Sequence, residues 1–252
     1  MSLALALGAC TPAPSRPTER PRTSPRLPAP WVQKFVDHDG VRIEYRVRAG
    51  TGVPVLLVPG MTGSAAYYEE ASAFTVALGD RPLVALSLRG RGQSALPDTG
   101  YTPADHHGDI RAVVEAENLH RYHLVTHSMG VAYGLGFALG RPTGEIASFT
   151  AGDYFPAVMQ VSAEWAANVD AHHPGLGTHI LREQGAVDYA DRLSALAMPL
   201  LVILGTESSE PAVEALWAKA PHHRVLWIAD GHGTFKNGDA IAATAAHLRA
   251  AD

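Results

Sequence analysis

The chain has 252 residues, of which 46% are hydrophobic and 18% charged, with a net charge of −5 and a sequence pI of about 6.2. This length and composition indicate a globular protein with one large α/β domain or two small ones. The weakly acidic balance gives no sign of a nucleic-acid surface, and the single cysteine, Cys10, excludes an internal disulfide and a thiolate metal site. No apolar run is long enough to span a membrane as a helix.

The first 30 residues differ in composition from the rest of the chain. Residues 1–10 are mainly apolar and end in LGAC, which is similar to the lipobox of a bacterial lipoprotein, although no Lys or Arg precedes the apolar stretch. Residues 11–30 hold seven of the 18 prolines and could extend over ~60 Å. We therefore expect a signal, a linker and a folded domain over 31–252, attached to a membrane through lipidated Cys10. A leader without function, on a cytoplasmic protein, is the alternative.

The folded part begins with a predicted hairpin and then alternates strands with helices. Residues 33–38 and 41–48 alternate in polarity and flank Asp39-Gly40, a pair typical of tight hairpin turns. The alternation that follows predicts a mostly parallel sheet with helices on both faces. Further strands are predicted over 53–58, 83–88, 122–127, 145–151, 200–204 and 224–229, and helices over 67–78, 105–118, 131–139 and 239–249.

Four chemically useful side chains, Ser128, Asp153, Glu207 and His232, directly follow predicted strands. The carboxyl ends of parallel strands share one edge, where the sites of such sheets lie. Ser128 is predicted at a sharp turn between strand and helix, which would expose its hydroxyl for attack on a carbonyl. An ordinary helix N-cap explains the same serine. Thr126 stands where the usual elbow motif has glycine, and its β-branched side chain fits a close turn less easily.

Five segments in this order resemble the α/β-hydrolase superfamily, over roughly residue 32 to the end of the chain. They are 55–60 (VLLVPG), 88–94 (LRGRGQS), 127–130 (HSMG), 199–205 (PLLVILG) and 231–233 (GHG). The resemblance implies an α/β-hydrolase fold, that is, a mostly parallel, doubly wound sheet with a small helical cap. It also implies a catalytic triad and an oxyanion hole that work without a cofactor.

The same resemblance assigns roles to single residues. Ser128 would be the nucleophile and His232 the general base, and the backbone N–H groups of Met61 and Met129 would form the oxyanion hole. Relatives often carry Asp at the position of Ser87, where it is usually structural, so this change should leave catalysis intact.

The catalytic acid is ambiguous, because relatives supply it after either of two strands. Asp153 follows the earlier strand and Glu207 the later one. Ser208 stands where relatives with a late acid have Asp, and relatives with serine there often use the earlier acid. We favour Asp153 and keep Glu207 as the alternative.

Residues 154–198 fall where relatives insert a cap. Val158, Val161, Trp165 and Val169 lie at helical spacing, which predicts a helix with an apolar stripe. Any one of these residues is better explained by packing on the end of the sheet, but together we expect them to roof the site. Candidates for the substrate pocket are Tyr154, Phe155 and Trp165. A cap of this modest length favours a small-to-medium, largely apolar acyl or alkyl group.

The other histidines give no pattern of metal ligands. Three adjacent pairs, 106–107, 172–173 and 222–223, place neighbouring side chains in different directions, so they are poorly suited to share one ion. We expect no metal site. His127, beside the nucleophile, is expected to shape the elbow.

These patterns together favour a serine hydrolase that acts on a carboxylic ester or similar acyl compound, with a small molecule as its substrate. Other chemistries of the same fold stay open, namely C–C bond hydrolysis, lactone opening and perhydrolysis. Haloalkane and epoxide cleavage are disfavoured, because those relatives have Asp in place of Ser128. A non-catalytic ligand-binding protein is the alternative of a different class, and Thr126 keeps it open.

Overall fold

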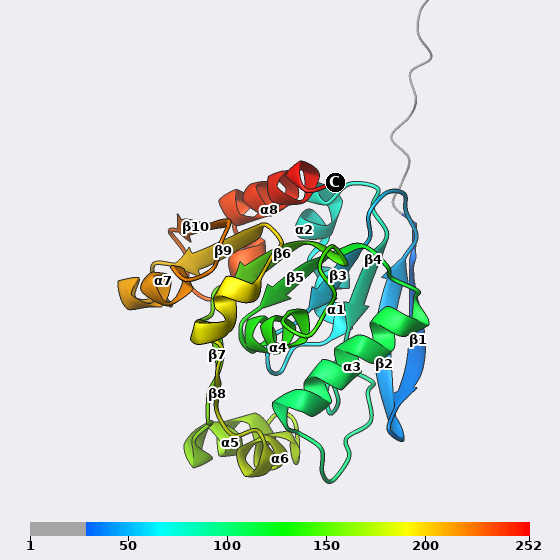
Figure 1. Cartoon of the computed structure of the whole chain (residues 1–252). Helices are drawn as coiled ribbons and strands as arrows, with labels where there is room; N and C mark the ends of the chain where they lie inside the picture. Colours follow the sequence, from blue (N-terminus) through cyan, green and yellow to red (C-terminus); the bar gives the residue numbers. More distant parts are fainter. Residues whose placement is uncertain (1–28) are drawn as a thin grey trace, which may run out of the picture.

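The computed structural model describes residues 29–252, so the predicted signal with Cys10 and most of the predicted linker lie outside the described residues. The described chain forms an eight-stranded sheet in the order β1-β2-β4-β3-β5-β6-β9-β10 (Figure 1). β1 pairs with β2 and β2 with β4 in antiparallel fashion, and the other neighbours are parallel. The strands are β1 Trp31–His38, β2 Val41–Arg48, β3 Val55–Val58, β4 Leu83–Leu86, β5 Tyr122–His127, β6 Ile146–Gly152, β9 Leu200–Gly205 and β10 His223–Ile228.

The predicted N-terminal hairpin is confirmed. β1 and β2 pair from Trp31 with Arg48 to His38 with Val41. The two turn residues, Asp39 and Gly40, have φ of 51° and 78°. Positive φ at both positions is what a two-residue type I′ turn requires, and an Asp-Gly pair supplies it at low cost.

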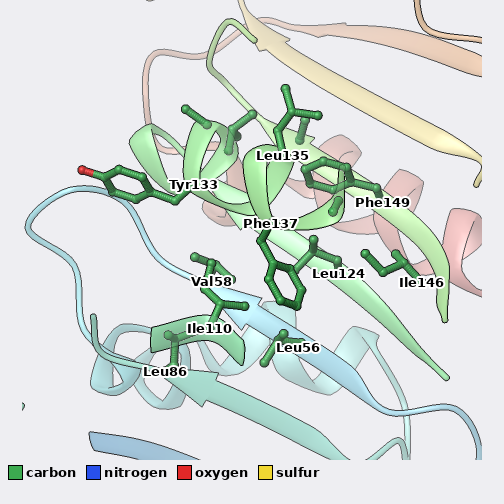
Figure 2. Packing of buried hydrophobic residues seen from close by; sticks show 14 of the residues in the cluster. Leu56, Val58, Leu86, Ile110, Leu124, Tyr133, Leu135, Phe137, Ile146 and Phe149 are labelled. Carbon is green, nitrogen blue, oxygen red and sulfur yellow. The ribbon is translucent and has the colours of Figure 1, made fainter. Parts of the chain in front are cut away.

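Helices cover both faces of the sheet because its central strands are apolar on both sides. In β3, Leu56 and Val58 belong to the core that lies under α3 and α4, whereas Val55 and Leu57 belong to the core under α1, α2 and α8. Figure 2 shows Phe137 of α4 above Leu56 and beside Leu124. The helices are α1 Ala65–Glu70, α2 Ser72–Ala77, α3 Pro103–Ala116, α4 Met129–Ala138, α7 Pro211–Trp217 and α8 Gly238–Ala250, with a 3₁₀ turn η2 at Thr234–Lys236.

The single helix predicted over 67–78 is two helices, interrupted at Ala71, whose ψ is 56°. Tyr68 and Phe74 are both fully buried in the same core. Six residues correspond to about 600° of rotation, so these two side chains would lie on different faces of one continuous helix. The break lets both of them reach the core. Among residues 29–252, no helix combines the length and apolarity that a bilayer crossing needs.

The segment between β6 and β9, where a cap was predicted, forms a ribbon and two helices at one end of the molecule (Figure 1). The predicted helix through Val158 and Val161 is wrong. Val158 lies in the ribbon opposite Val187, and the helix begins only after Ser162, whose Oγ accepts the backbone N–H of Trp165 at 3.0 Å. The elements are β7 Ala157–Val158, α5 Ala163–Asp170, α6 Leu176–Glu183, β8 Val187–Asp188 and a 3₁₀ helix η1 at Ala190–Ala195.

Thr126, the departure from the elbow motif, is accommodated by a glycine on the facing helix. A Cβ on Gly134 of α4 would lie 2.6 Å from Thr126 Cγ2. The Thr126 hydroxyl donates to the Thr150 carbonyl at 3.0 Å, so its polar atom is satisfied in the core. The space that a glycine in the strand would provide is thus provided by a glycine in the helix.

We expect Gly134→Ala to lower the free energy of unfolding by about 1–3 kcal/mol, because the new methyl overpacks against Thr126. In an open helix the same change would stabilise by up to about 1 kcal/mol. Thr126→Ser removes only the facing methyl, so the double variant should recover most of the loss. Urea denaturation of the four proteins measures the coupling between the two sites, and a coupling near zero would contradict this packing.

Candidate active site

Ser128 sits at the turn between β5 and α4 in a backbone conformation that L-residues rarely adopt. Its φ is 54° and its ψ is −138°. The Ser128 N–H donates to the Gly152 carbonyl at 2.8 Å, which ties the turn to β6. Its side chain makes no capping hydrogen bond to α4, so this serine is not an ordinary N-cap. Strained residues of this kind gather at functional sites, where the surrounding structure holds them.

Two glycines allow the chain to pass close to this turn. A Cβ on Gly130 would lie 2.2 Å from the Pro59 carbonyl oxygen, and a Cβ on Gly60 would lie 2.9 Å from Ser128 Cβ. Any side chain at either position would push the loop after β3 away from the serine. The glycines therefore bring the backbone of that loop next to the hydroxyl.

The structure brings Ser128, His232 and Asp153 together in a hydrogen-bonded chain. His232 Nε2 lies 2.7 Å from Ser128 Oγ, and His232 Nδ1 lies 2.6 Å from Asp153 Oδ2. A carboxylate only accepts, so these partners place the proton of a neutral His232 on Nδ1 and leave Nε2 to accept the serine hydroxyl. The His232 side chain is about half exposed, at 52%, whereas Asp153 is buried.

Asp153 is held by more donors than His232 alone. It follows β6 with φ 53° and accepts hydrogen bonds from the Gly205 N–H at 2.8 Å, Ser208 Oγ at 2.6 Å and Ser209 Oγ at 2.9 Å. Burial opposes the charged form of Asp153, but the bonds from His232, Ser208, Gly205 and Ser209 outweigh it and lower the pKa of the carboxyl to about 2. The acid is therefore ionised at any pH near neutrality.

Glu207 occupies a different environment. Its side chain is exposed, and within residues 29–252 it makes no hydrogen bond or ion pair with His232. Ser208, the next residue, instead donates to Asp153. Ser208, at the position where the resembled superfamily often carries its late acid, thus holds Asp153 in this chain. Ser209, which also contacts Asp153, gave no signal in the sequence.

His127 contacts the backbone of His232. Its Nε2–H donates to the His232 carbonyl at 2.7 Å, and its ring stacks against Tyr67 with centroids 6.2 Å apart. Burial, together with the nearby His232, lowers the pKa of His127 to about 4. A neutral ring with a fixed donor therefore holds the His232 backbone, a contact that sequence reasoning missed.

Two backbone N–H groups beside the cavities at Ser128 have no acceptor in the described part of the chain. Within residues 29–252, neither the Met61 N–H nor the Met129 N–H donates to a protein acceptor. Met129 is the first residue of α4, and the first N–H groups of a helix carry partial positive charge. Both residues adjoin the cavities around Ser128.

Two cavities meet at Ser128, and both are lined by Met61, Ser128 and Trp165. The first, of about 360 Å³, is otherwise lined by the loop 59–63 with Tyr67, His127 and His232. The second, of about 340 Å³, is otherwise lined by Met129, Tyr154 and residues 159–162. A larger hollow of about 550 Å³ lies between residues 77–81 and the end of α8, away from this chemistry.

Two of the three residues predicted for the pocket line a cavity at Ser128, and the third does not. Tyr154 and Trp165 line the second cavity at Ser128. Phe155 stacks on Tyr154 with ring centroids 4.0 Å apart, but it lines a separate groove with Leu216 and not the cavities at the serine. Among the described residues, no group of three or more metal-ligating side chains gathers at one point.

Comparison with solved structures shows the same architecture. An esterase, RhEst1 from Rhodococcus sp. ECU1013, matches with a TM-score of 0.70 and 21% identity, over 87% of this chain and 97% of the other. The chain has the α/β-hydrolase fold. A sequence model described as "Alpha/beta hydrolase family" matches residues 55–158.

Curated relatives match part of the chain. "Putative carbamate hydrolase RutD" of Variovorax paradoxus is 38% identical over 92 residues, 36% of this chain and 34% of that protein. "N-formylmaleamate deformylase" of Pseudomonas putida is 34% identical over 101 residues, 40% of this chain and 37% of that protein. The matches thus span about a third of the length of these relatives.

The pKa of His127 predicts a pH dependence of stability. Because the folded-state pKa is about 4, the unfolded chain binds this proton between about pH 6.5 and 4 while the folded chain does not. Stability should therefore fall with decreasing pH over that window, by at most about 1.4 kcal/mol per pH unit from this group. His127→Gln, which keeps a donor for the His232 carbonyl, should make the decline shallower.

Urea denaturation at several values between pH 6.5 and 4.5 measures this difference. Other buried histidines titrate in wild type and in His127→Gln alike. The contribution of His127 is therefore the difference between the two proteins in the slope of unfolding free energy against pH. His120→Gln, at an exposed position on the loop before β5, is the matched control and should leave the slope unchanged. Equal slopes for wild type and His127→Gln would contradict the assignment.

Proposed function

We propose that the chain is a serine hydrolase that cleaves a small-to-medium carboxylic ester or similar acyl compound through an acyl-enzyme. The observation that carries the proposal is the hydrogen-bonded chain from Ser128 through His232 to Asp153, at 2.7 and 2.6 Å. Nucleophile, base and orienting acid in this order are the constellation that acyl transfer needs.

The reaction follows from the geometry. Ser128 Oγ attacks the acyl carbon while His232 Nε2 takes its proton, and ionised Asp153 stabilises the imidazolium that forms. The Met61 and Met129 N–H groups bind the oxyanion of the tetrahedral intermediate. His232 then gives the proton to the leaving alcohol, and water activated by the same nitrogen hydrolyses the acyl-enzyme.

The two cavities suggest where the parts of the substrate lie. The cavity with Met129, Tyr154 and the cap residues is mainly apolar and suits the acyl group. The cavity beside His232 suits the leaving group, because His232 must protonate that oxygen. Two relatives are named for the hydrolysis of a carbamate and of an N-formyl compound, so these substrate classes join esters in the assay.

Turnover of p-nitrophenyl esters of increasing acyl length should be detectable in wild type and lost in Ser128→Ala, because the hydroxyl is the attacking atom. A cavity of about 340 Å³ predicts an optimum at short to medium acyl chains. Activity that survives in Ser128→Ala would overturn the proposal. If no ester, carbamate or N-formyl compound is hydrolysed, a serine-directed phosphonate distinguishes the two remaining cases. An enzyme with a narrow substrate range should be labelled stoichiometrically, whereas a ligand-binding protein should not.

Asp153→Asn should lower kcat by roughly 10³–10⁴, because an amide no longer fixes the tautomer of His232 or balances the imidazolium. Glu207→Gln, the matched carboxylate-to-amide change at the exposed position, should change kcat less than about threefold. Steady-state kinetics of both variants on the best ester decides between the two acids. A large loss in Glu207→Gln with little change in Asp153→Asn would assign the acid to Glu207.

A further inference from the structure

Arg91 is a buried cation beneath the active site that the mechanism above does not use. Only 1% of its surface is exposed, and within residues 29–252 no carboxylate forms an ion pair with it. Its neighbour Arg89, by contrast, pairs with Asp109 at 2.7 Å. A buried charge without a partner of opposite sign is costly, so its contacts call for an explanation.

The Arg91 guanidinium binds backbone carbonyls and a neutral ring. Its Nε–H donates to the Met61 carbonyl at 2.7 Å, and Nη1 donates to the Arg89 carbonyl at 2.6 Å and to His106 Nε2 at 3.0 Å. His106 Nδ1 donates to the Thr102 carbonyl at 2.8 Å, which leaves its Nε2 as an acceptor. Arg91 Nη2 has no acceptor among the described residues.

The surroundings of Arg91 are fixed from the side of the cap. The ring of His106 stacks on that of Tyr133 with centroids 4.2 Å apart. The Tyr133 hydroxyl donates to Gln184 Oε1 at 2.5 Å, and Gln184 Nε2 donates to the Met159 carbonyl at 2.7 Å. The contact from Arg91 to Met61 thus comes from a rigid and buried set of side chains.

The loop that Arg91 contacts carries one of the two N–H groups proposed to bind the oxyanion. The Gly60 carbonyl accepts the Gly63 N–H at 3.0 Å, and a trans peptide places the Met61 N–H on the side opposite that carbonyl. Arg91 holds the next carbonyl, that of Met61. Two successive carbonyls of residues 60–63 are therefore anchored, one within the turn and one by Arg91.

We propose that Arg91 is a positioning residue for this loop, which holds the Met61 carbonyl so that the Met61 N–H stays directed at the oxyanion formed on Ser128. The positive charge of Arg91, which no carboxylate of the described residues pairs with, also favours the negative charge that forms on the oxyanion. The proposal rests on the proposed serine hydrolase function. It assigns to Arg91 no contact with substrate.

The test compares Arg91→Met and Arg91→Lys with Arg48→Met. Arg48 is a matched control, because it is also buried, at 4% exposure, and donates to two backbone carbonyls, those of Thr75 and Gly79, away from the site. The probe is a p-nitrophenyl alkylphosphonate. Ser128 Oγ forms a bond to phosphorus, p-nitrophenolate leaves, and the serine proton passes to His232, while the phosphoryl oxygen occupies the oxyanion position.

We expect Arg91→Met to slow labelling of Ser128 and to lower ester kcat by about 10–100-fold, with KM changed less than about threefold. Loss of a whole oxyanion donor costs about 10²–10³, and a mispositioned donor should cost less. Arg91→Lys should be intermediate, because an ammonium cannot reproduce the planar fork that spans two carbonyls. Arg48→Met should lower the melting temperature while its labelling rate stays that of wild type.

Labelling of folded Arg91→Met at the wild-type rate would overturn the proposal. If Arg91→Met fails to fold, Arg91→Lys decides, since a wild-type kcat in that variant overturns it and a lower kcat at unchanged KM supports it. Equal losses in Arg48→Met and Arg91→Met would reduce Arg91 to a structural role. Absence of labelling in wild type would instead overturn the serine hydrolase function on which this inference rests.

Discussion

The close approach of helix α4 to the loop after β3 determines the geometry of the site. Gly130 makes this approach feasible, because any Cβ there would lie 2.2 Å from the Pro59 carbonyl oxygen. The contact sets the distance between Ser128, at the start of the helix, and the backbone of Met61 in the loop. In the proposed reaction these two groups act on the same carbonyl, and this backbone contact relates their positions.

Two departures from the motifs of the resembled superfamily are compensated by residues in other elements of the fold. Thr126 fits because Gly134 faces it without a side chain. Ser87 stands where relatives often have Asp, and its hydroxyl accepts the Ala65 N–H and donates to Glu44 Oε2, both at 2.9 Å. Glu44 of β2 thus supplies the carboxylate that an Asp at position 87 would provide. Inspection of a motif one residue at a time cannot reveal these compensating residues, because they lie in other helices and strands.

The sequence predicted the edge of the sheet at which the site lies, since continuous apolar runs fix where buried strands end. It left the choice between Asp153 and Glu207 open, because both follow strands at that edge. In the structure His232 contacts Asp153 and not Glu207, and Ser208 and Ser209 donate to Asp153 as well. The cap was predicted least well. Residues from Val158 to Val169 do have helical spacing, but Val158 pairs with Val187 in the ribbon, and α5 begins only after its N-cap residue Ser162.

The backbone conformations of Ser128 and Asp153 have a consequence for how the protein could change. Both residues have φ near +50°, where an L-residue with a side chain costs on the order of 1–3 kcal/mol. Glycine would relieve that cost at either position. Selection for thermal resistance alone would therefore favour loss of the proposed nucleophile and its proposed acid, and the rest of the domain must supply the free energy that keeps both residues in place.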